Sequence, residues 1–154
     1  MGQNFLISED VLSEIMSAAS VRKDDTVLEA GPGLGMLTEA LAKKARFVVT
    51  IEKDPFLLAV LRKKFKEEKI QNVLLQEGDI LTFSSDAMKQ FGSPYMIVAN
   101  IPYYLTARFL RKFLSEESFQ PSSITLLLQR EVAERIAAHD SRESILSLSI
   151  RAYG

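Results

Sequence analysis

The stretch "TVLEAGPGLGMLTEALAKK", residues 26 to 44, decides the fold. It begins with an apolar run of strand length and ends, from about Met36, in an amphipathic stretch of helix length. Between them, Gly31, Gly33 and Gly35 allow the backbone to turn sharply and to approach a ligand closely. Strand, glycine turn and helix in this order predict one unit of a sheet whose helix crosses over to a parallel neighbour.

The rest of the chain repeats this alternation of apolar runs and amphipathic stretches. It predicts an α/β domain with a mostly parallel central sheet and helices on both faces. We expect strands at residues 26–31, 47–52, 72–79, 95–100, 123–129 and 145–153. We expect helices that begin after an N-cap at Ser8 and at Pro55, others at 36–44, 106–114 and 131–138, and a short one near Met88.

Composition limits the class of protein. The 154 residues, 47% hydrophobic and 25% charged, match one globular domain. There is no Cys and His139 is the only His, so we expect neither disulfides nor a metal cluster. No apolar run reaches the roughly 18 residues of a membrane helix, and the first residues do not resemble a signal peptide. We therefore expect a cytoplasmic protein that does not bind membranes.

Ligands of such sheets bind beyond the carboxyl ends of the strands. The glycine turn has the spacing G-x-G-x-G, and not the G-x-G-x-x-G of dinucleotide sites, so a nicotinamide dehydrogenase is disfavoured. The turn alone is equally consistent with a tight strand-to-helix connection.

Two acids follow at the next strand ends. Glu52 lies about 20 residues beyond the glycine turn, where a carboxylate can accept hydrogen bonds from both ribose hydroxyls. The alternative is a surface Glu paired with Lys53. Asp79 can accept a hydrogen bond from an adenine amino group while Ile80 packs on the ring, although Asp after Gly is also a common turn. Glycine turn and two acids in consecutive units favour a nucleoside site.

The turn "NIPYY", residues 100 to 104, ends the fourth strand with unusual residues. Asn100 offers a hydrogen-bond acceptor and a donor, and Pro102 stiffens the turn. Tyr103 offers a flat surface on which a base can stack. Tyr104 fits better as a packed aromatic of the turn.

Several motifs together resemble a known family. "NIPY" resembles the signature of methyltransferases that use S-adenosylmethionine to methylate a conjugated amino group. With "GQNFL" (2–6), "EAGPGLGMLT" (29–38), "IEKD" (51–54), "EGDIL" (77–81) and "LLLQREVAERI" (126–136), nearly the whole chain resembles the KsgA-type ribosomal RNA adenine dimethyltransferases. The resemblance implies a Rossmann-like S-adenosylmethionine-dependent methyltransferase fold. It also implies dimethylation of the exocyclic amine of adenosines in small-subunit ribosomal RNA or a pre-30S particle.

The resemblance implies roles for individual residues. Asn100, Pro102 and Tyr103 are the implied catalytic residues, placed where cofactor and target base meet. The implied contacts to S-adenosyl-L-methionine come from the N-terminal segment and the strand ends. They are Gln3, Asn4, Leu6, Gly31, Glu52, Asp79, Ile80 and Asn100.

The implied reaction needs geometry more than acid–base chemistry. The adenine amine is a poor nucleophile because its lone pair is delocalised, so amine, methyl and sulfur must be held in line. Hydrogen bonds from the amine to the Asn100 side-chain oxygen and to a backbone carbonyl of Ile101 or Pro102 would support the charge that develops on nitrogen.

Basic residues after the "NIPYY" turn are candidates for RNA phosphate contacts. Arg108, Arg111 and Lys112 border the expected base pocket. The alternative is that they only solvate a helix face.

Two other functions stay open at this point. One is an erythromycin-resistance type methyltransferase of large-subunit ribosomal RNA. The other is a non-catalytic cofactor-binding ribosome-assembly or transcription factor, although "NIPY" argues against it because such a factor would not need Asn100 and Tyr103.

The family's further strand, its aromatic loop and its small helical RNA-binding domain are absent from residues 1–154. We expect a truncated, monomeric catalytic domain that binds S-adenosylmethionine but methylates ribosomal RNA feebly or not at all.

Overall fold

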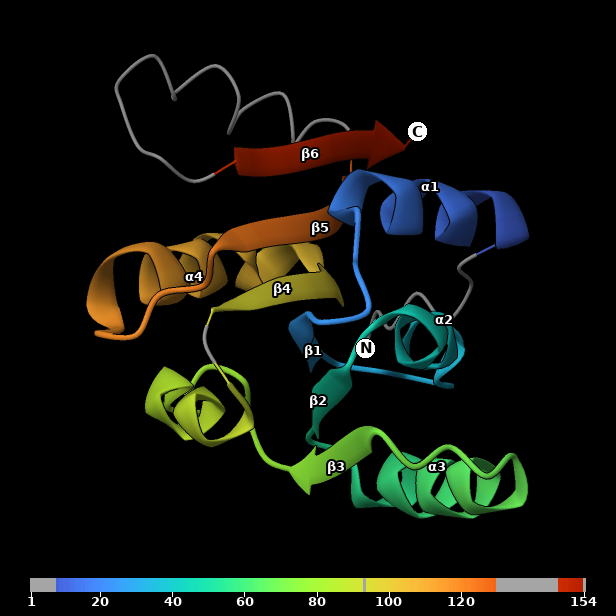
Figure 1. The fold of residues 1–154 in the computed structure, drawn as a ribbon. Helices are drawn as coiled ribbons and strands as arrows, with labels where there is room; N and C mark the ends of the chain where they lie inside the picture. Colours follow the sequence, from blue (N-terminus) through green and yellow to red (C-terminus); the bar gives the residue numbers. More distant parts are fainter. Residues whose placement is uncertain (1–7, 93, 130–146, 154) are drawn as a thin grey trace.

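The computed structural model describes residues 8–92, 94–129 and 147–153. Its elements follow one another as strand and helix in alternation (Figure 1). They are α1 (Glu9–Ala19), β1 (Thr26–Ala30), α2 (Met36–Lys44), β2 (Phe47–Glu52), α3 (Pro55–Glu67), β3 (Val73–Glu77), the 3₁₀ helix η1 (Ser85–Phe91), β4 (Tyr95–Asn100), the 3₁₀ turn η2 (Tyr103–Leu105), α4 (Thr106–Arg111), the π-helical turn η3 (Lys112–Glu116), β5 (Ser123–Gln129) and β6 (Ser147–Tyr153).

Six strands form one sheet in the order β3-β2-β1-β4-β5-β6, which can be followed from bottom to top in Figure 1. All five pairings are parallel. The chain reverses its direction of travel across the sheet between β1 and β4, and ligands of such sheets bind at this switch point. The expected α/β architecture with a parallel sheet is therefore confirmed.

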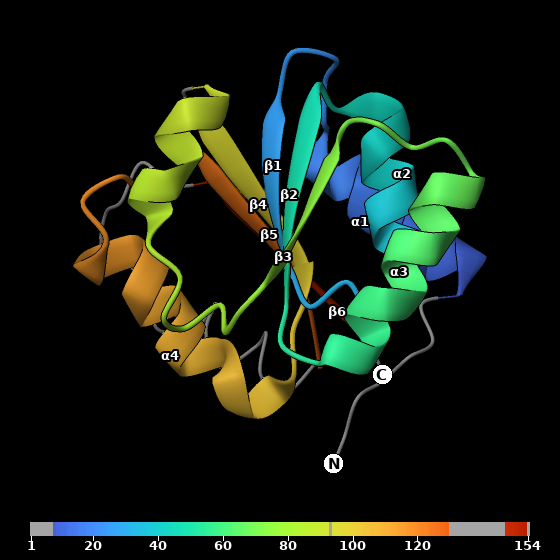
Figure 2. The same cartoon turned by 90° about the horizontal axis from the view of Figure 1, so that it is seen from below.

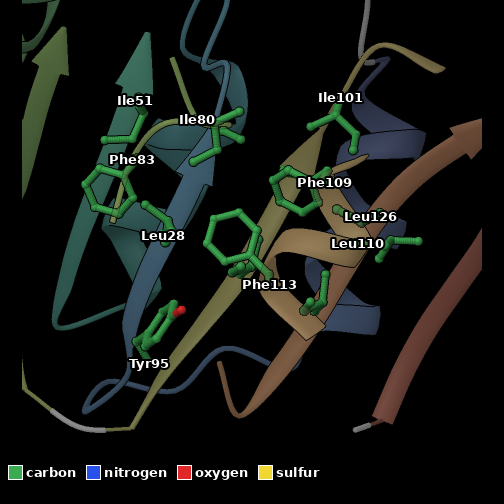
Figure 3. Packing of buried hydrophobic residues seen from close by; sticks show 14 of the residues in the cluster. Leu28, Ile51, Ile80, Phe83, Tyr95, Ile101, Phe109, Leu110, Phe113 and Leu126 are labelled. Atoms are coloured by element: carbon green, nitrogen blue, oxygen red, sulfur yellow. The ribbon is translucent and has the colours of Figure 1, made fainter. Parts of the chain in front are cut away.

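Alternating side chains of the strands build a core on each face of the sheet. Val27 and Val48 pack under α1 and α2, whereas their neighbours Leu28 and Val49 point to the opposite face. On that second face the core is closed by η1, α4 and η3, with residues such as Phe109 (Figure 3). Figure 2 shows α1, α2 and α3 on one side of the sheet and α4 on the other.

Local sequence sets where the helices begin. The Ser8 hydroxyl accepts a hydrogen bond from the Val11 N–H at 3.3 Å, and the Asp54 carboxylate accepts one from the Phe56 N–H at 2.8 Å. Pro55 occupies the first turn of α3, as the sequence predicts. The expected helix over 106–114 begins at Thr106 as predicted, but it is α-helical only to Arg111, and from Lys112 the backbone continues as the π-helical turn η3.

Parts of the prediction lie outside the described residues. These are the expected helix at 131–138 and the cofactor residues Gln3, Asn4 and Leu6. Within the described ranges, no helix is both long enough and apolar enough to cross a membrane.

Gly35 provides a test of how the glycine turn joins β1 to α2. Its φ of +86° disfavours any other residue, and a Cβ there would lie 2.7 Å from Leu61 Cδ2 on α3. We expect Gly35→Ala to lower the free energy of unfolding by about 2–4 kcal/mol, measured by urea denaturation, because left-handed backbone strain and overpacking add.

The matched control is Gly78→Ala. Its added Cβ would make an ordinary contact of 3.7 Å with Ile51, and its φ is not in the left-handed region. The change in stability should stay within about 1 kcal/mol. Equal effects of the two substitutions would contradict this account of the turn.

Candidate functional site

The carboxyl ends of the first four strands bring the predicted site residues to one edge of the sheet. Two backbone hydrogen bonds fix the loops there: the Gly31 N–H donates to the Ile51 carbonyl and the Gly78 N–H to the Glu52 carbonyl, both at 2.9 Å. The glycine turn, Glu52 and the loop that carries Asp79 are therefore neighbours, as the sequence predicts. Gly31 has a φ of +67°. Apart from its chain neighbours, no atom of the described residues lies within 4 Å of where its Cβ would be, so the backbone is open to a ligand on this side.

Glu52 is a buried carboxylate with one unoccupied oxygen. The side chain is 4% exposed, and its Oε1 accepts hydrogen bonds from the backbone N–H groups of Lys53 and Asp54, both at 2.8 Å. Its Oε2 is buried and has no partner among the described residues. The alternative of a surface Glu paired with the Lys53 ammonium is wrong, because that ammonium pairs with Asp79. A buried polar atom without a partner is costly, which makes Oε2 a ready acceptor for a ligand.

Asp79 is held as an anion at the end of β3. Its Oδ1 accepts a hydrogen bond from the Leu81 N–H at 2.9 Å, and its Oδ2 lies 3.0 Å from Lys53 Nζ. These two bonds, and the charges of Lys53 and Arg108, hold the pKa of Asp79 below its usual value despite partial burial. The carboxylate can therefore only accept hydrogen bonds.

Ile80 lies mostly in the core. It is 8% exposed and belongs to the same hydrophobic cluster as Ile51 and Ile101 (Figure 3). Most of its side chain is packed in the core, so only a small part is accessible to a ligand. Its expected contact with the face of an adenine ring stays a prediction.

The turn after β4 exposes two aromatic rings. Asn100 is half-buried at the end of the strand, and Ile101 is buried beneath the turn. Tyr103 and Tyr104 are 62% and 64% exposed and meet edge to face, with ring centroids 5.8 Å apart. The expectation that Tyr104 packs inside the turn is wrong. The core below is already filled by Ile101 and other apolar side chains, so both tyrosines remain at the surface.

Glu29 belongs to this region and was not recognised as a separate site residue from the sequence. It is 1% exposed, next to the last residue of β1, and its Oε2 accepts a hydrogen bond from the Thr38 hydroxyl of α2 at 2.6 Å. Burial raises its pKa to about 7; the Thr38 and Thr50 hydroxyls partly oppose this rise and the Glu52 charge adds to it. The signal in the sequence was an acid inside an otherwise apolar strand.

The three basic residues predicted to contact RNA have different surroundings. Arg108 is exposed and close enough to Asp79 to lower the pKa of that carboxyl. Arg111 is also exposed and pairs with Glu116 at 3.0 Å. Both remain available at the surface beside the tyrosine turn.

Lys112 does not fit the predicted role. Its side chain is 11% exposed, forms an ion pair with Glu117 and lies 5.5 Å from the centre of the Phe113 ring. Glu117 also accepts hydrogen bonds from the Ser85 N–H and hydroxyl. Lys112 is thus held in a structural contact between η3 and η1, and we remove it from the candidate RNA surface.

No group of three or more His, Cys, Asp or Glu side chains in the described ranges is arranged to hold a metal ion. The polar groups of this edge are the open backbone at Gly31, the carboxylates of Glu52 and Asp79, and the amide of Asn100, which precedes the exposed tyrosines in the chain. This set suits a neutral nucleoside with hydroxyl and amino donors better than a pyrophosphate, because carboxylates accept hydrogen bonds from such donors and repel a second anion.

The fold and this edge define a domain of the S-adenosylmethionine-dependent methyltransferase class, Rossmann-like in its parallel sheet. The chain belongs to the ribosomal RNA adenine dimethylase family, whose sequence model matches residues 1–153.

Three relatives illustrate the similarity. Ribosomal RNA small subunit methyltransferase A from Dehalococcoides mccartyi is 45% identical over 154 residues, which are 100% of this chain and 52% of that protein. A dimethyladenosine transferase from Plasmodium falciparum is 30% identical, with a TM-score of 0.75 over 87% of this chain and 46% of its own. The 23S rRNA methyltransferase ErmE is 33% identical, with a TM-score of 0.76 over 92% of this chain and 54% of its own. The chain spans about half the length of the curated relatives it matches.

The raised pKa of Glu29 predicts how stability depends on pH. Between the ordinary value of 4.5 and about 7, the folded protein keeps a proton that the unfolded chain loses. Stability therefore falls as pH rises through this window, by up to about 3 kcal/mol. Gln is neutral throughout, so the free energy of unfolding of Glu29→Gln relative to wild type should rise between about pH 5 and pH 8.

The variant Glu117→Gln should show the opposite trend. Burial raises the pKa of Glu117, but the bonds from Lys112 and Ser85 outweigh burial and lower it overall. Removing this charge therefore costs more stability as pH rises through the acid range up to about 4.5, and above that range the cost stays constant. If Glu29→Gln showed a pH-independent difference from wild type, the protonated state of Glu29 would be refuted.

Proposed function

We propose that this chain binds S-adenosyl-L-methionine at the carboxyl edge of the sheet and serves in the dimethylation of adenosine amines in small-subunit ribosomal RNA. The observation that carries the proposal is the unpartnered Glu52 Oε2, which is buried beside the open glycine turn and the anionic Asp79. Family membership and the 45% identity to a small-subunit methyltransferase support the choice of reaction and RNA.

The residues present fit the parts of this cofactor. Glu52 has a free, oriented oxygen for the ribose hydroxyls, and Asp79 is an obligate acceptor for the adenine amino group. The open space at Gly31 suits the methionine part. When bound, the cofactor supplies an activated methyl group on a sulfonium.

The turn at Asn100 suits the target base. The Asn100 side-chain oxygen and the backbone carbonyls of Ile101 or Pro102 can accept hydrogen bonds from an adenine amine and support positive charge on it. Tyr103, 62% exposed, offers a face for stacking. Stacking is worth about 1–3 kcal/mol per base and helps to offset the few kcal/mol spent on removing the adenosine from its RNA stack.

Exposed cations beside the turn suit the RNA backbone. Arg108 and Arg111 lie on α4, directly after Tyr103 and Tyr104. Phosphate contacts position the nucleic acid without reading its sequence, so these arginines would orient the RNA while the turn receives the base.

The alternatives are less well supported. ErmE is 33% identical, whereas the small-subunit relative is 45% identical over the whole chain. A non-catalytic factor would not need Asn100 beside an exposed Tyr103. The monomeric state and the cytoplasmic location stay predictions from the sequence.

The cofactor site is tested by Glu52→Gln. We expect the affinity for S-adenosylhomocysteine, measured by calorimetry, to fall about 10- to 100-fold, because a hydrogen bond to a charged group is worth about 1.5–3 kcal/mol. Glu77→Gln is the matched control: Glu77 is the register partner of Glu52 on β3 and is exposed. Its affinity should stay within about twofold of wild type. Equal losses in both variants would refute the ribose contact.

The reaction is tested with unmethylated small subunits, S-adenosylmethionine carrying a labelled methyl group, and enough protein to detect slow turnover. Dimethyladenosine is measured by mass spectrometry. We expect Asn100→Ala to lower its formation about 100-fold, as when a group that stabilises developing charge is removed. Asn100 is also an implied cofactor contact, so binding of S-adenosylhomocysteine should weaken, but by no more than about tenfold, because Glu52 and Asp79 are untouched. Label incorporation that does not depend on Asn100 would contradict the mechanism.

A further inference from the structure

Lys53 lies between the two acids of the proposed cofactor site. It directly follows Glu52, and its ammonium is 3.0 Å from Asp79 Oδ2 across the ends of β2 and β3. The Lys53 side chain is 78% exposed and that of Asp79 is 33% exposed. The ion pair is therefore exposed to solvent and accessible to a ligand.

The two oxygens of Asp79 are not equivalent. Oδ1 accepts the Leu81 N–H, within the turn that leads to the buried Phe83. Oδ2 accepts a hydrogen bond from the Lys53 ammonium, and it is the oxygen that an incoming donor would reach from solvent. A ligand amino group that reaches Oδ2 from the solvent side thus has to share or replace the hydrogen bond from the Lys53 ammonium.

We propose that Lys53 is an internal competitor for the adenine subsite: it neutralises Asp79 in the empty protein and is displaced when an adenine amino group binds. The proposal rests on the proposed function, because it takes Asp79 as the adenine acceptor. Its consequence is that Lys53 weakens binding of the cofactor and of its demethylated product alike.

Weaker binding of both molecules has a use in the proposed reaction. Two methyl transfers to one amine consume two cofactor molecules, so the product has to leave between them. An ion pair that re-forms behind the departing adenine favours this exchange. Exposed ion pairs of this kind change an equilibrium by about two- to fivefold, which is enough to shift occupancy without abolishing binding.

The test uses 5′-methylthioadenosine, which carries the adenine and ribose of the cofactor and no net charge. A neutral probe separates competition for Asp79 from long-range attraction or repulsion of a charged ligand. Binding is measured by calorimetry to wild type and to Lys53→Met, which keeps an unbranched apolar side chain and removes the ammonium. Each is measured at about 0.02 M and about 0.5 M salt, because salt at the higher concentration screens exposed charges strongly.

We expect Lys53→Met to bind the probe about two- to fivefold more tightly than wild type at low salt. Wild-type affinity should rise towards that of the variant at high salt, since screening weakens the competing ion pair. The control is Lys63→Met, which removes an equally exposed lysine (79%) from a pair with Glu67 at 3.9 Å on α3. It should behave as wild type.

Equal or weaker binding by Lys53→Met would overturn the inference while leaving the nucleoside site in place. Equally tighter binding by Lys63→Met would also overturn it. The gain in affinity would then come from the loss of any one positive charge, and not from the loss of the ion pair with Asp79. Failure of both wild type and Lys53→Met to bind the probe would overturn the proposed cofactor site and this inference with it.

Discussion

Parallel pairing of β1 with both β2 and β4 is the constraint on which the rest of the structure depends. Because all strands run the same way, the loops after β1, β2, β3 and β4 leave the sheet at one edge. The hydrogen bonds from Gly31 to the Ile51 carbonyl and from Gly78 to the Glu52 carbonyl extend this order into the loops. Residues far apart in the chain thereby lie together at one edge of the sheet.

The acids of this edge are handled in three different ways. Glu29 is fully enclosed, and burial raises its pKa to about 7, so below neutral pH it joins β1 to α2 mostly as a neutral group. Glu52 is buried, and two backbone amides orient its Oε1, while its Oε2 has no partner in the part of the chain that the structure describes. Asp79 is partly exposed and balanced by Lys53. The charge of these acids thus increases from the interior to the surface. This arrangement suits a ligand whose nucleoside end is uncharged.

The exposure of the tyrosine turn and of the basic residues after it depends on how α4 packs on the sheet. Phe109 and Phe113 are fully buried, so the apolar side of α4 and η3 is used for packing. The turn at its start therefore presents Tyr103 and Tyr104 outward. At its end, Lys112 is drawn into the contact with Glu117 and Ser85. Packing thus divides one basic segment into an exposed part, with Arg108 and Arg111, and a structural part.

The sequence by itself determined the elements and the edge. Apolar periodicity located α2 and β2 at their observed bounds, and the strand ends identified Glu52 and Asp79 as neighbours of the glycine turn. Only the tertiary structure decided the partners and the exposure of individual side chains. It pairs Lys53 with Asp79 and Lys112 with Glu117. It also buries Glu29 and exposes Tyr104. The physical reason is that periodicity reports on which face of an element is apolar. The charge state and accessibility of a side chain depend instead on contacts between residues distant in the chain.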